Sequence, residues 1–194
     1  MTKAKVELVF ISPDPEAHIG EQASECYDSA TGRDACVRRA AHCVSLGHLA
    51  TLRFAYATFR VSNISRACSH QFVRVAHAGI LQRSQRYVKE SSVDYVDPPT
   101  LADMPDHLRA AWLKIQADAE AVYLACIDAK MQKGDARYIL PQGCTTSLRV
   151  TGNFQMWRDL LGNRTSLAAQ WEVRDVAKEI KRQLAEHAPN IFGV

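Results

Sequence analysis

An amphipathic repeat in the second half of the chain constrains the fold more than any other feature. Between residues 106 and 130, apolar side chains recur three or four positions apart, which is the period of one face of an α-helix. Asp106 at the start of the repeat is a residue type that caps helices. We therefore predict a long helix near 106–130 that buries an apolar stripe in the core. The stripe consists of Leu108, Trp112, Ile115, Ala119, Val122 and Cys126.

Around this helix, strand patterns are few and are separated by helical patterns. Alternating segments predict strands at 5–11, 52–61 and 145–151. Helical periodicity predicts helices at 15–29, 34–46, 64–73, 154–161 and 168–186. Asn63 is expected to cap the helix that follows it, and Gly47 to end the helix before it. This order indicates an α+β fold, and because no linker or repeat divides the 194 residues, we expect a single domain over 1–194.

Composition narrows the class of function. The formal net charge of +3 suits an anionic small molecule, but the sequence has no basic tract of the kind that binds nucleic acid polymers. The six cysteines form no Cys-x-x-Cys pair, so we expect reduced thiols, no disulfide framework and no metal site. The sequence has neither a run of 18 apolar residues nor an apolar leader segment, so we expect a cytoplasmic protein without a membrane span.

Residues 71–87, which we call the signature segment, gather groups that suit a phosphate. Arg74, Arg83 and Arg86 fall within 13 residues, together with the hydroxyl of Ser84. Arginine forks bind phosphate oxygens in pairs, and a hydroxyl adds a further donor. Composition alone leaves open the alternative that the segment is a solvated basic loop.

The signature segment resembles a motif of the flavin-dependent thymidylate synthases, the ThyX family. That motif reads Arg-His-Arg, seven residues, Ser, and then usually x-Arg-Tyr. Here Arg74, Ser84 and Arg86-Tyr87 keep the spacing, while Val75 and Ala76 replace the family's His and second Arg. The resemblance covers most of the chain and implies the ThyX fold, a small mixed or antiparallel sheet flanked by helices. Further pieces in the family's order are Leu46-Gly47-His48, Ala136-Arg137-Tyr138-Ile139-Leu140-Pro141, Thr151-Gly152-Asn153, Asn163-Arg164 and Ala169-Gln170-Trp171-Glu172.

The resemblance also implies a substrate, a reaction and an assembly. The substrate is a pyrimidine nucleoside monophosphate, dUMP or a relative, which receives a one-carbon unit at C5 from methylenetetrahydrofolate. Arg164 is implied to lie against the pyrimidine, where a fixed cation stabilises the negative charge that develops as C5 becomes nucleophilic. Family members are homotetramers with sites shared between subunits, so a homotetramer is implied here as well. The implied nucleotide-binding residues are Gln71, Arg74, Gln82, Ser84, Arg86 and Arg137.

The residues expected to face a flavin depart from the family pattern. The resemblance implies FAD and NADPH as cofactors, with Arg74 and Asn153 as FAD contacts. Loss of a charge-assisted hydrogen bond removes about 1.5–3 kcal/mol. Two alternatives therefore stay open beside reductive methylation: a flavin-independent hydroxymethylase acting on nucleotide C5, and an inactive nucleotide-binding homologue. Side chains that are apolar or absent replace polar family residues at Ala50, Val75, Ala76, Gly79 and Leu81.

Simpler roles also stay open for several of these side chains. Without the resemblance, Arg137 and Arg164 would be explained as surface ion pairs with acids such as Asp135. His70 and His77, on or beside the signature segment, are expected to be packed or hydrogen-bonded rather than catalytic.

Overall fold

A computed structural model describes residues 3–26, 28–29, 32–90 and 92–193, and it confirms the predicted α+β fold. One antiparallel sheet has the strand order β1-β2-β4-β3. Its strands are β1 (Lys5–Ile11), β2 (Tyr56–Ser65), β3 (Gly79–Gln82) and β4 (Thr145–Asn153). The α-helices are α1 (Pro15–Ser24), α2 (Arg33–Ser45), α3 (Arg66–Phe72), α4 (Asp106–Asp128), α5 (Lys133–Ala136), α6 (Phe154–Arg164), α7 (Trp171–His187) and α8 (Pro189–Phe192). Short 3-10 helices are η1 (Leu49–Phe54), η2 (Pro99–Asp103) and η3 (Arg137–Ile139).

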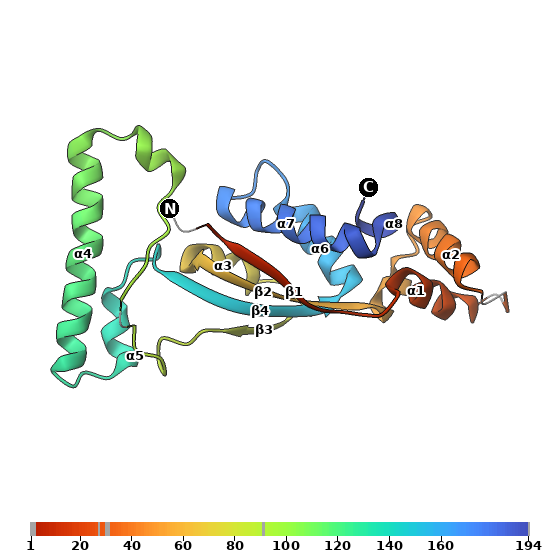
Figure 1. The fold of residues 1–194 in the computed structure, drawn as a ribbon, viewed down its shortest axis with the longest axis horizontal. Helices are drawn as coiled ribbons and strands as arrows, with labels where there is room; N and C mark the ends of the chain where they lie inside the picture. Colours follow the sequence, from red (N-terminus) through yellow and green to blue (C-terminus); the bar gives the residue numbers. More distant parts are fainter. Residues whose placement is uncertain (1–2, 27, 30–31, 91, 194) are drawn as a thin grey trace.

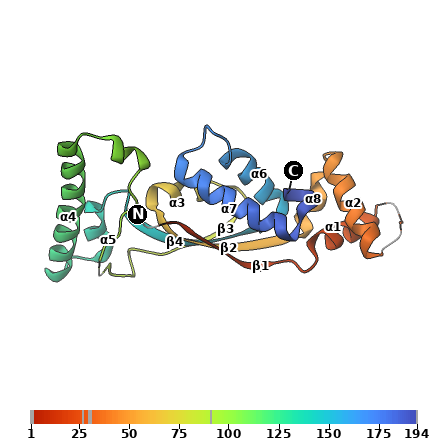
Figure 2. The same ribbon diagram turned by 45° about the horizontal axis from the view of Figure 1, so that its top comes forward.

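Helices cover one face of the sheet and extend beyond both of its ends. Figure 1 shows α3, α6 and α7 over one face, and Figure 2 shows the same layering after rotation. The helices α1 and α2 pack together beyond one end of the sheet, while α4 and α5 stand beyond the other end (Figure 1). Among the described residues, no helix covers the opposite face of the sheet (Figures 1 and 2).

The core between the sheet and these helices fixes the position of α6. Trp157 of α6 is fully buried, and its ring meets the ring of Phe59 on β2 edge to face, with centroids 5.1 Å apart. The indole Nε1 donates a hydrogen bond to the carbonyl oxygen of Ala57 at 3.0 Å. A buried tryptophan with its N–H satisfied combines a large apolar contact with a fixed orientation. This contact holds α6, which carries Arg164, against the sheet.

Element boundaries near the signature segment differ from the prediction. Residues Leu49–Phe54 form η1, so β2 begins at Tyr56 rather than at residue 52. Asn63 lies inside β2 at a register shift, with a φ angle of 57°, and does not cap a helix. Asparagine tolerates this left-handed conformation, which accommodates the irregular pairing. The cap is Ser65, whose hydroxyl accepts a hydrogen bond from the amide of Cys68 at 2.9 Å.

The first two helices form where they were predicted, but the first of them is shorter than predicted. Gly47 has a φ angle of 74° and follows the end of α2, as predicted. The helix predicted at 15–29 ends at Ser24 as α1. Residue 27 of that predicted segment lies outside the described residues.

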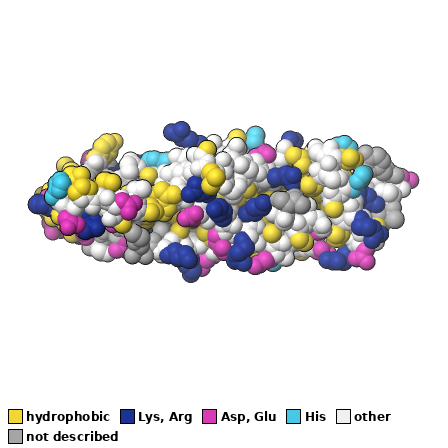
Figure 3. All heavy atoms as spheres, turned by 90° about the horizontal axis from the view of Figure 1, so that it is seen from above, with side chains coloured by type: hydrophobic (Ala, Val, Ile, Leu, Met, Phe, Trp, Pro, Cys, Tyr) yellow, Lys and Arg dark blue, Asp and Glu magenta, His cyan; other side chains and the backbone are white. Residues whose placement is uncertain are grey.

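The long helix α4 is confirmed, but most of its apolar stripe lies outside the core. Ala119 is buried, whereas four stripe residues are 43–62% exposed: Leu108, Trp112, Ile115 and Val122. The helix stands clear of the sheet (Figure 1), and apolar side chains gather at this end of the space-filling view (Figure 3). Periodicity identified the helix and its apolar face, but it carries no information about what covers that face. We call these four residues the exposed stripe.

Three further observations bear on the class of protein. None of the described helices is both long and apolar enough to cross a membrane. All six cysteines are free thiols. Within the described ranges, no three His, Cys, Asp or Glu side chains are grouped so that they could hold a metal ion.

Candidate active site

A cavity of about 800 Å³ lies beside α6, where the chain leaves α3. This volume is in the range of small-molecule sites. Arg53, Arg74 and Arg164 line it, and Asp159 supplies a carboxylate, so the charged lining is positive overall. The chemistry of this lining suits an anionic ligand. The other lining residues are Val75, Ala76, His77, Asn153, Gln155, Met156, Leu160, Asn163, Ala168 and Ala169.

Arg74 reaches the cavity because α3 ends just before it. Phe72, the last residue of α3, is 1% exposed and fixes the end of the helix in the core. The amide of Val75 donates to the carbonyl oxygen of Phe72 at 3.0 Å, which turns the chain. His77 then adopts a φ angle of 63°. Positive φ is uncommon for a residue with a side chain, so this turn brings 74–77 to the cavity wall through an unusual backbone conformation.

The two ends of α6 place Asn153 and Arg164 on the same cavity. Asn153 is the N-cap, and its Oδ1 accepts a hydrogen bond from the amide of Met156 at 2.9 Å. Arg164 is the last residue of α6, where a cation interacts favourably with the helix dipole. Its Nη2 donates to the carbonyl oxygen of Gln71 at 3.4 Å, which links the ends of α6 and α3. Gln71, Arg74, Asn153 and Arg164 therefore belong to one region of the molecule.

The remaining predicted nucleotide residues form a second group, which we call the loop group: Ser84, Arg86 and Arg137. Ser84 Oγ accepts a hydrogen bond from the amide of Arg86 at 3.3 Å. Arg86 lies beside α5, since a Cβ added at Gly134 would be 3.7 Å from its Cγ. Arg137 follows α5 and donates from Nε to the carbonyl oxygen of Gly134 at 3.1 Å. Figure 1 shows α5 beyond the end of the sheet, away from α6. Within one chain, the structure therefore separates the loop group from Arg164.

Gln82 lies at the end of β3 between these two regions. Its Nε2 donates to Ser69 Oγ at 2.9 Å and to Thr146 Oγ1 at 3.3 Å. Deeper in the loop, Gln85 is 5% exposed and its Nε2 contacts Cys144 Sγ at 3.6 Å. Burial raises the pKa of the Cys144 thiol, so this thiol stays protonated at neutral pH. These buried contacts hold the base of the loop that carries Ser84 and Arg86.

Arg83 has a different role from the other two arginines of the signature segment. Its Nη1 pairs with the Glu90 carboxylate at 2.5 Å, and Glu90 is 7% exposed. The amide of Glu90 donates to the buried hydroxyl of Tyr123 at 3.2 Å, which ties the loop to α4. An arginine paired with a nearly buried carboxylate has a structural role and is not available to bind a ligand. The sequence could not separate Arg83 from Arg74 and Arg86, because Glu90 and Tyr123 are brought to it only by folding.

Residues that the sequence reasoning did not select also line the cavity. Arg53 lies in η1, and its Nε donates to Gln155 Oε1 at 2.7 Å. The sequence predicts a strand over this segment, so it does not indicate that Arg53 lies at the cavity. His77 is exposed and lines the cavity, so it is not packed, whereas the expectation that it forms hydrogen bonds rather than acting in catalysis stays a prediction. The left-handed turn at His77 is the reason, and no sequence signal indicates it.

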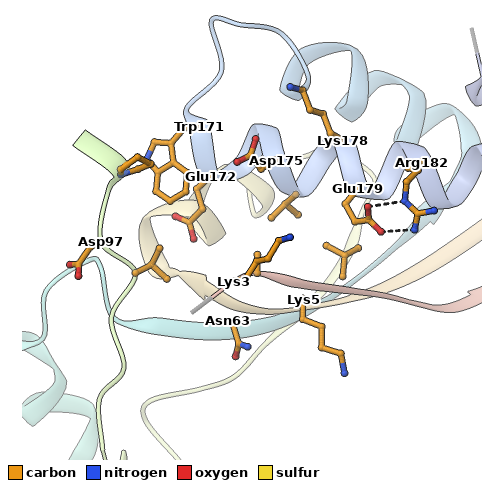
Figure 4. A pocket seen from close by; sticks show the side chains of 15 residues that line it. Lys3, Lys5, Asn63, Asp97, Trp171, Glu172, Asp175, Lys178, Glu179 and Arg182 are labelled. Carbon is orange, nitrogen blue, oxygen red and sulfur yellow. Dashed lines mark hydrogen bonds and ion pairs between the residues drawn. The ribbon is translucent and has the colours of Figure 1, made fainter. Parts of the chain in front are cut away.

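Figure 4 shows a second cavity, of about 880 Å³, between α7, the start of β1 and residues 96–99. None of the predicted site residues lines it. Two of its carboxylates are already satisfied: Glu179 pairs with Arg182 at 2.7 Å, and Glu172 accepts from the Ser65 hydroxyl at 2.5 Å. The hydrogen bond from Arg182 lowers the pKa of Glu179 to about 2. The cavity beside α6 is therefore the better candidate for an active site.

Comparison with known proteins identifies the family of the chain. A family model described as "Thymidylate synthase complementing protein" matches residues 7–190. A flavin-dependent thymidylate synthase of Mycobacteroides abscessus is 37% identical over 166 residues, which is 78% of this chain and 66% of the relative. Proteins of the same name from Mycobacterium avium and Mycolicibacterium vanbaalenii are 35% and 34% identical over the same shares. The chain thus spans 66% of the length of these relatives.

The match over 7–190 covers nearly the whole chain, so the chain belongs to the thymidylate synthase complementing protein family, also called ThyX. The resemblance seen in the signature segment is thereby confirmed.

Proposed function

We propose that the chain is a thymidylate synthase of the flavin-dependent type. It transfers a one-carbon unit from methylenetetrahydrofolate to C5 of a pyrimidine nucleoside monophosphate, dUMP or a relative. The observation that carries the proposal is the positive cavity beside α6, which gathers Arg74, Asn153 and Arg164 in a chain of this family. We also take residues 1–194 to act as a single domain, in keeping with the match over 7–190.

Arg164 has the central role in this reaction. C5 of the pyrimidine forms a bond to the one-carbon unit, the bond from that carbon to the folate nitrogen breaks, and the C5 proton leaves. Negative charge spreads over the base as C5 attacks. The Arg164 guanidinium, fixed on the carbonyl of Gln71, stabilises that charge without having to reorganise. Arg164 is therefore assigned as the catalytic residue.

The donor set of the cavity also fits FAD, the cofactor in the relatives' name. FAD carries a diphosphate, and Arg53 and Arg74 supply guanidinium donors for such an anion. Val75 and Ala76 supply none, and the side-chain oxygen of Asn153 caps α6. When bound, FAD supplies the hydride that completes the methyl group, and NADPH is the proposed source of that hydride. The residues proposed to hold FAD are Arg53, Arg74 and Asn153.

One observation favours a second candidate function. Val75 and Ala76 form part of the cavity wall at positions where the family's His and Arg would add polar donors. A site that binds nucleotide but no flavin would add water rather than hydride and yield a hydroxymethylated nucleotide. The positive charge of Arg53 in the same wall favours the flavin-dependent reaction.

Release of tritium from dUMP labelled at C5 tests the transfer itself. The wild-type protein with methylenetetrahydrofolate, FAD and NADPH is expected to release the label, because either transfer reaction removes the C5 proton. The reaction without protein is the control. Retention of the label in the complete reaction would contradict both candidate functions and leave only the inactive nucleotide-binding homologue.

Binding of the nucleotide phosphate is proposed to depend on the loop group. Replacing Arg86 with alanine is expected to weaken dUMP binding by about 1.5–3 kcal/mol, the contribution of a charge-assisted hydrogen bond. Calorimetric titration of dUMP measures the change. The matched control is Arg38→Ala, which removes an exposed arginine from α2, far from the loop group in sequence. Equal affinities in Arg86→Ala and the wild type would place the phosphate elsewhere.

The separation of the loop group from Arg164 supports a homo-oligomer, proposed to be a tetramer, whose sites combine residues of different chains. The exposed stripe on α4 supports the same proposal, because contiguous apolar surface of this kind marks an interface. An isologous contact would cover the stripe of each chain with the same surface of another.

Replacing Ile115 with aspartate is expected to shift the assembly to smaller species, since it buries a charge in that interface. Light scattering coupled to size-exclusion chromatography measures the mass. Lys114→Ala is the control, because Lys114 forms an exposed pair with Asp118 that contributes about 0.3–0.5 kcal/mol. A wild-type monomer, or an unchanged mass in Ile115→Asp, would contradict the proposed interface.

A further inference from the structure

We infer that Arg53 supplies the cation that the signature segment lacks at Ala76, and that it binds the diphosphate of FAD. The inference rests on the proposed function, since it concerns how the same cavity holds its flavin. Ala76 and Arg53 come from segments more than twenty residues apart in the sequence, yet both line the cavity beside α6. A cationic donor is thus present in the wall, although the signature segment does not provide it.

The backbone around Arg53 is fixed on both sides. Leu52 and Ala55 are fully buried, whereas Arg53 between them is exposed at the cavity. The carbonyl oxygen of Ala55 accepts a hydrogen bond from the amide of Phe154 at 2.9 Å, which joins the end of η1 to the start of α6. Arg53 is therefore held beside the first turn of α6 by a rigid local structure.

The side chain of Arg53 keeps its charge available to a ligand. Its partner is the neutral amide of Gln155, which accepts from Nε at 2.7 Å. In the part of the chain that the structure describes, no carboxylate forms an ion pair with Arg53. The hydrogen bond orients the guanidinium through Nε and leaves its two terminal nitrogens as a pair of donors. Paired donors of this geometry match the oxygens of a phosphate.

The position of Arg53 beside the first turn of α6 favours the flavin diphosphate over the nucleotide phosphate. Gln155 lies in the first turn of α6, where the helix dipole is positive, and Arg164 is its last residue. At 1.5 Å per residue, these two residues are roughly 14 Å apart along the helix. If Arg164 lies against the pyrimidine, Arg53 is at the other end of the cavity. The monophosphate of the substrate is already assigned to the loop group.

Titration of flavins into the purified protein tests this assignment, with flavin fluorescence as the readout. Arg53→Ala is expected to weaken FAD binding by about 10- to 100-fold, the factor expected for a charge-assisted hydrogen bond. Riboflavin has no phosphate, so its affinity is expected to stay unchanged, as is the affinity for dUMP. Arg53→Lys is expected to retain part of the FAD affinity, because it keeps the charge but not the fork. Arg38→Ala is the matched control for loss of an exposed arginine.

The outcomes separate this inference from the proposed function. Equal FAD affinity in Arg53→Ala and the wild type overturns the inference and leaves the proposed function standing. Equal losses for FAD and riboflavin also overturn it, since they indicate a general change of the cavity. A loss of dUMP affinity assigns Arg53 to the substrate phosphate and likewise overturns it. If the wild-type protein binds no FAD, the flavin-dependent function itself fails and the inference fails with it.

Discussion

Replacing Arg164 with alanine is expected to lower kcat by about 10²- to 10³-fold while KM for dUMP changes little. This is the usual effect of removing one preorganised electrostatic donor. The effect falls on kcat because the charge of Arg164 stabilises the base mainly after it has become anionic, in the transition state rather than in the ground state. Steady-state rates at varied dUMP concentration measure both constants.

The variant Arg164→Lys provides a second test of this role. Arg164→Lys is also expected to be slow, because an ammonium group cannot reproduce a planar guanidinium fork held on the carbonyl of Gln71. Arg38→Ala is expected to keep wild-type rates, since this exposed side chain lies on α2, outside the cavity. If Arg164→Ala turns over at the wild-type rate, the catalytic assignment is wrong.

Mixing two impaired variants, assayed at a dUMP concentration well below the KM of Arg86→Ala, is expected to restore activity. If Arg164 and Arg86 of one site come from different chains, Arg164→Ala and Arg86→Ala each damage every site. In a hybrid assembly, however, some sites receive both wild-type arginines. Random exchange of equal amounts gives about one quarter of the sites both of them, so about one quarter of wild-type activity is expected.

The mixture must exchange subunits for this result to appear. Denaturing and refolding the two variants together ensures exchange, and refolding each variant alone provides the control. Activity that equals the mean of the separately refolded variants would show that Arg164 and Arg86 serve a site within one chain. The proposed sharing of sites would then be wrong, although the proposed reaction would remain.

The resemblance predicted, before folding was considered, which residues share a candidate site. Arg74 and Arg164 are far apart in the sequence, and the resemblance placed both in one site. In the structure they line one cavity, because α3 and α6 end near each other. Family spacing encodes this proximity, whereas periodicity and composition do not. Their roles in binding and catalysis stay predictions.

The position of Arg53 at the cavity could not be predicted from the sequence. Its segment alternates in a way that predicts a strand, but residues Leu49–Phe54 form η1 before β2 begins. Propensity is overridden here by packing, since Leu52 and Ala55 are drawn into the core. The resulting placement of Arg53 at the cavity depends on tertiary contacts with α6. A pattern within a few residues cannot report such contacts.

The sequence also could not predict what covers the exposed stripe of α4. The period of Leu108, Trp112 and Ile115 identifies an apolar face, and an apolar face must be covered by something. Burial within the same chain and burial against another chain leave the same pattern in the sequence. The structure shows α4 beyond the end of the sheet with this face exposed, so the stripe is not covered by the described part of its own chain. Burial against another chain stays a proposal.

The mass of the nucleotide product shows whether the protein carries out reductive methylation, hydroxymethylation or neither. The purified protein is incubated with dUMP and methylenetetrahydrofolate, with FAD and NADPH both present, each omitted, or both omitted. We predict dTMP, formed only when FAD and NADPH are both present. A hydroxymethylated nucleotide formed without either cofactor, or unchanged dUMP in the complete reaction, would contradict it.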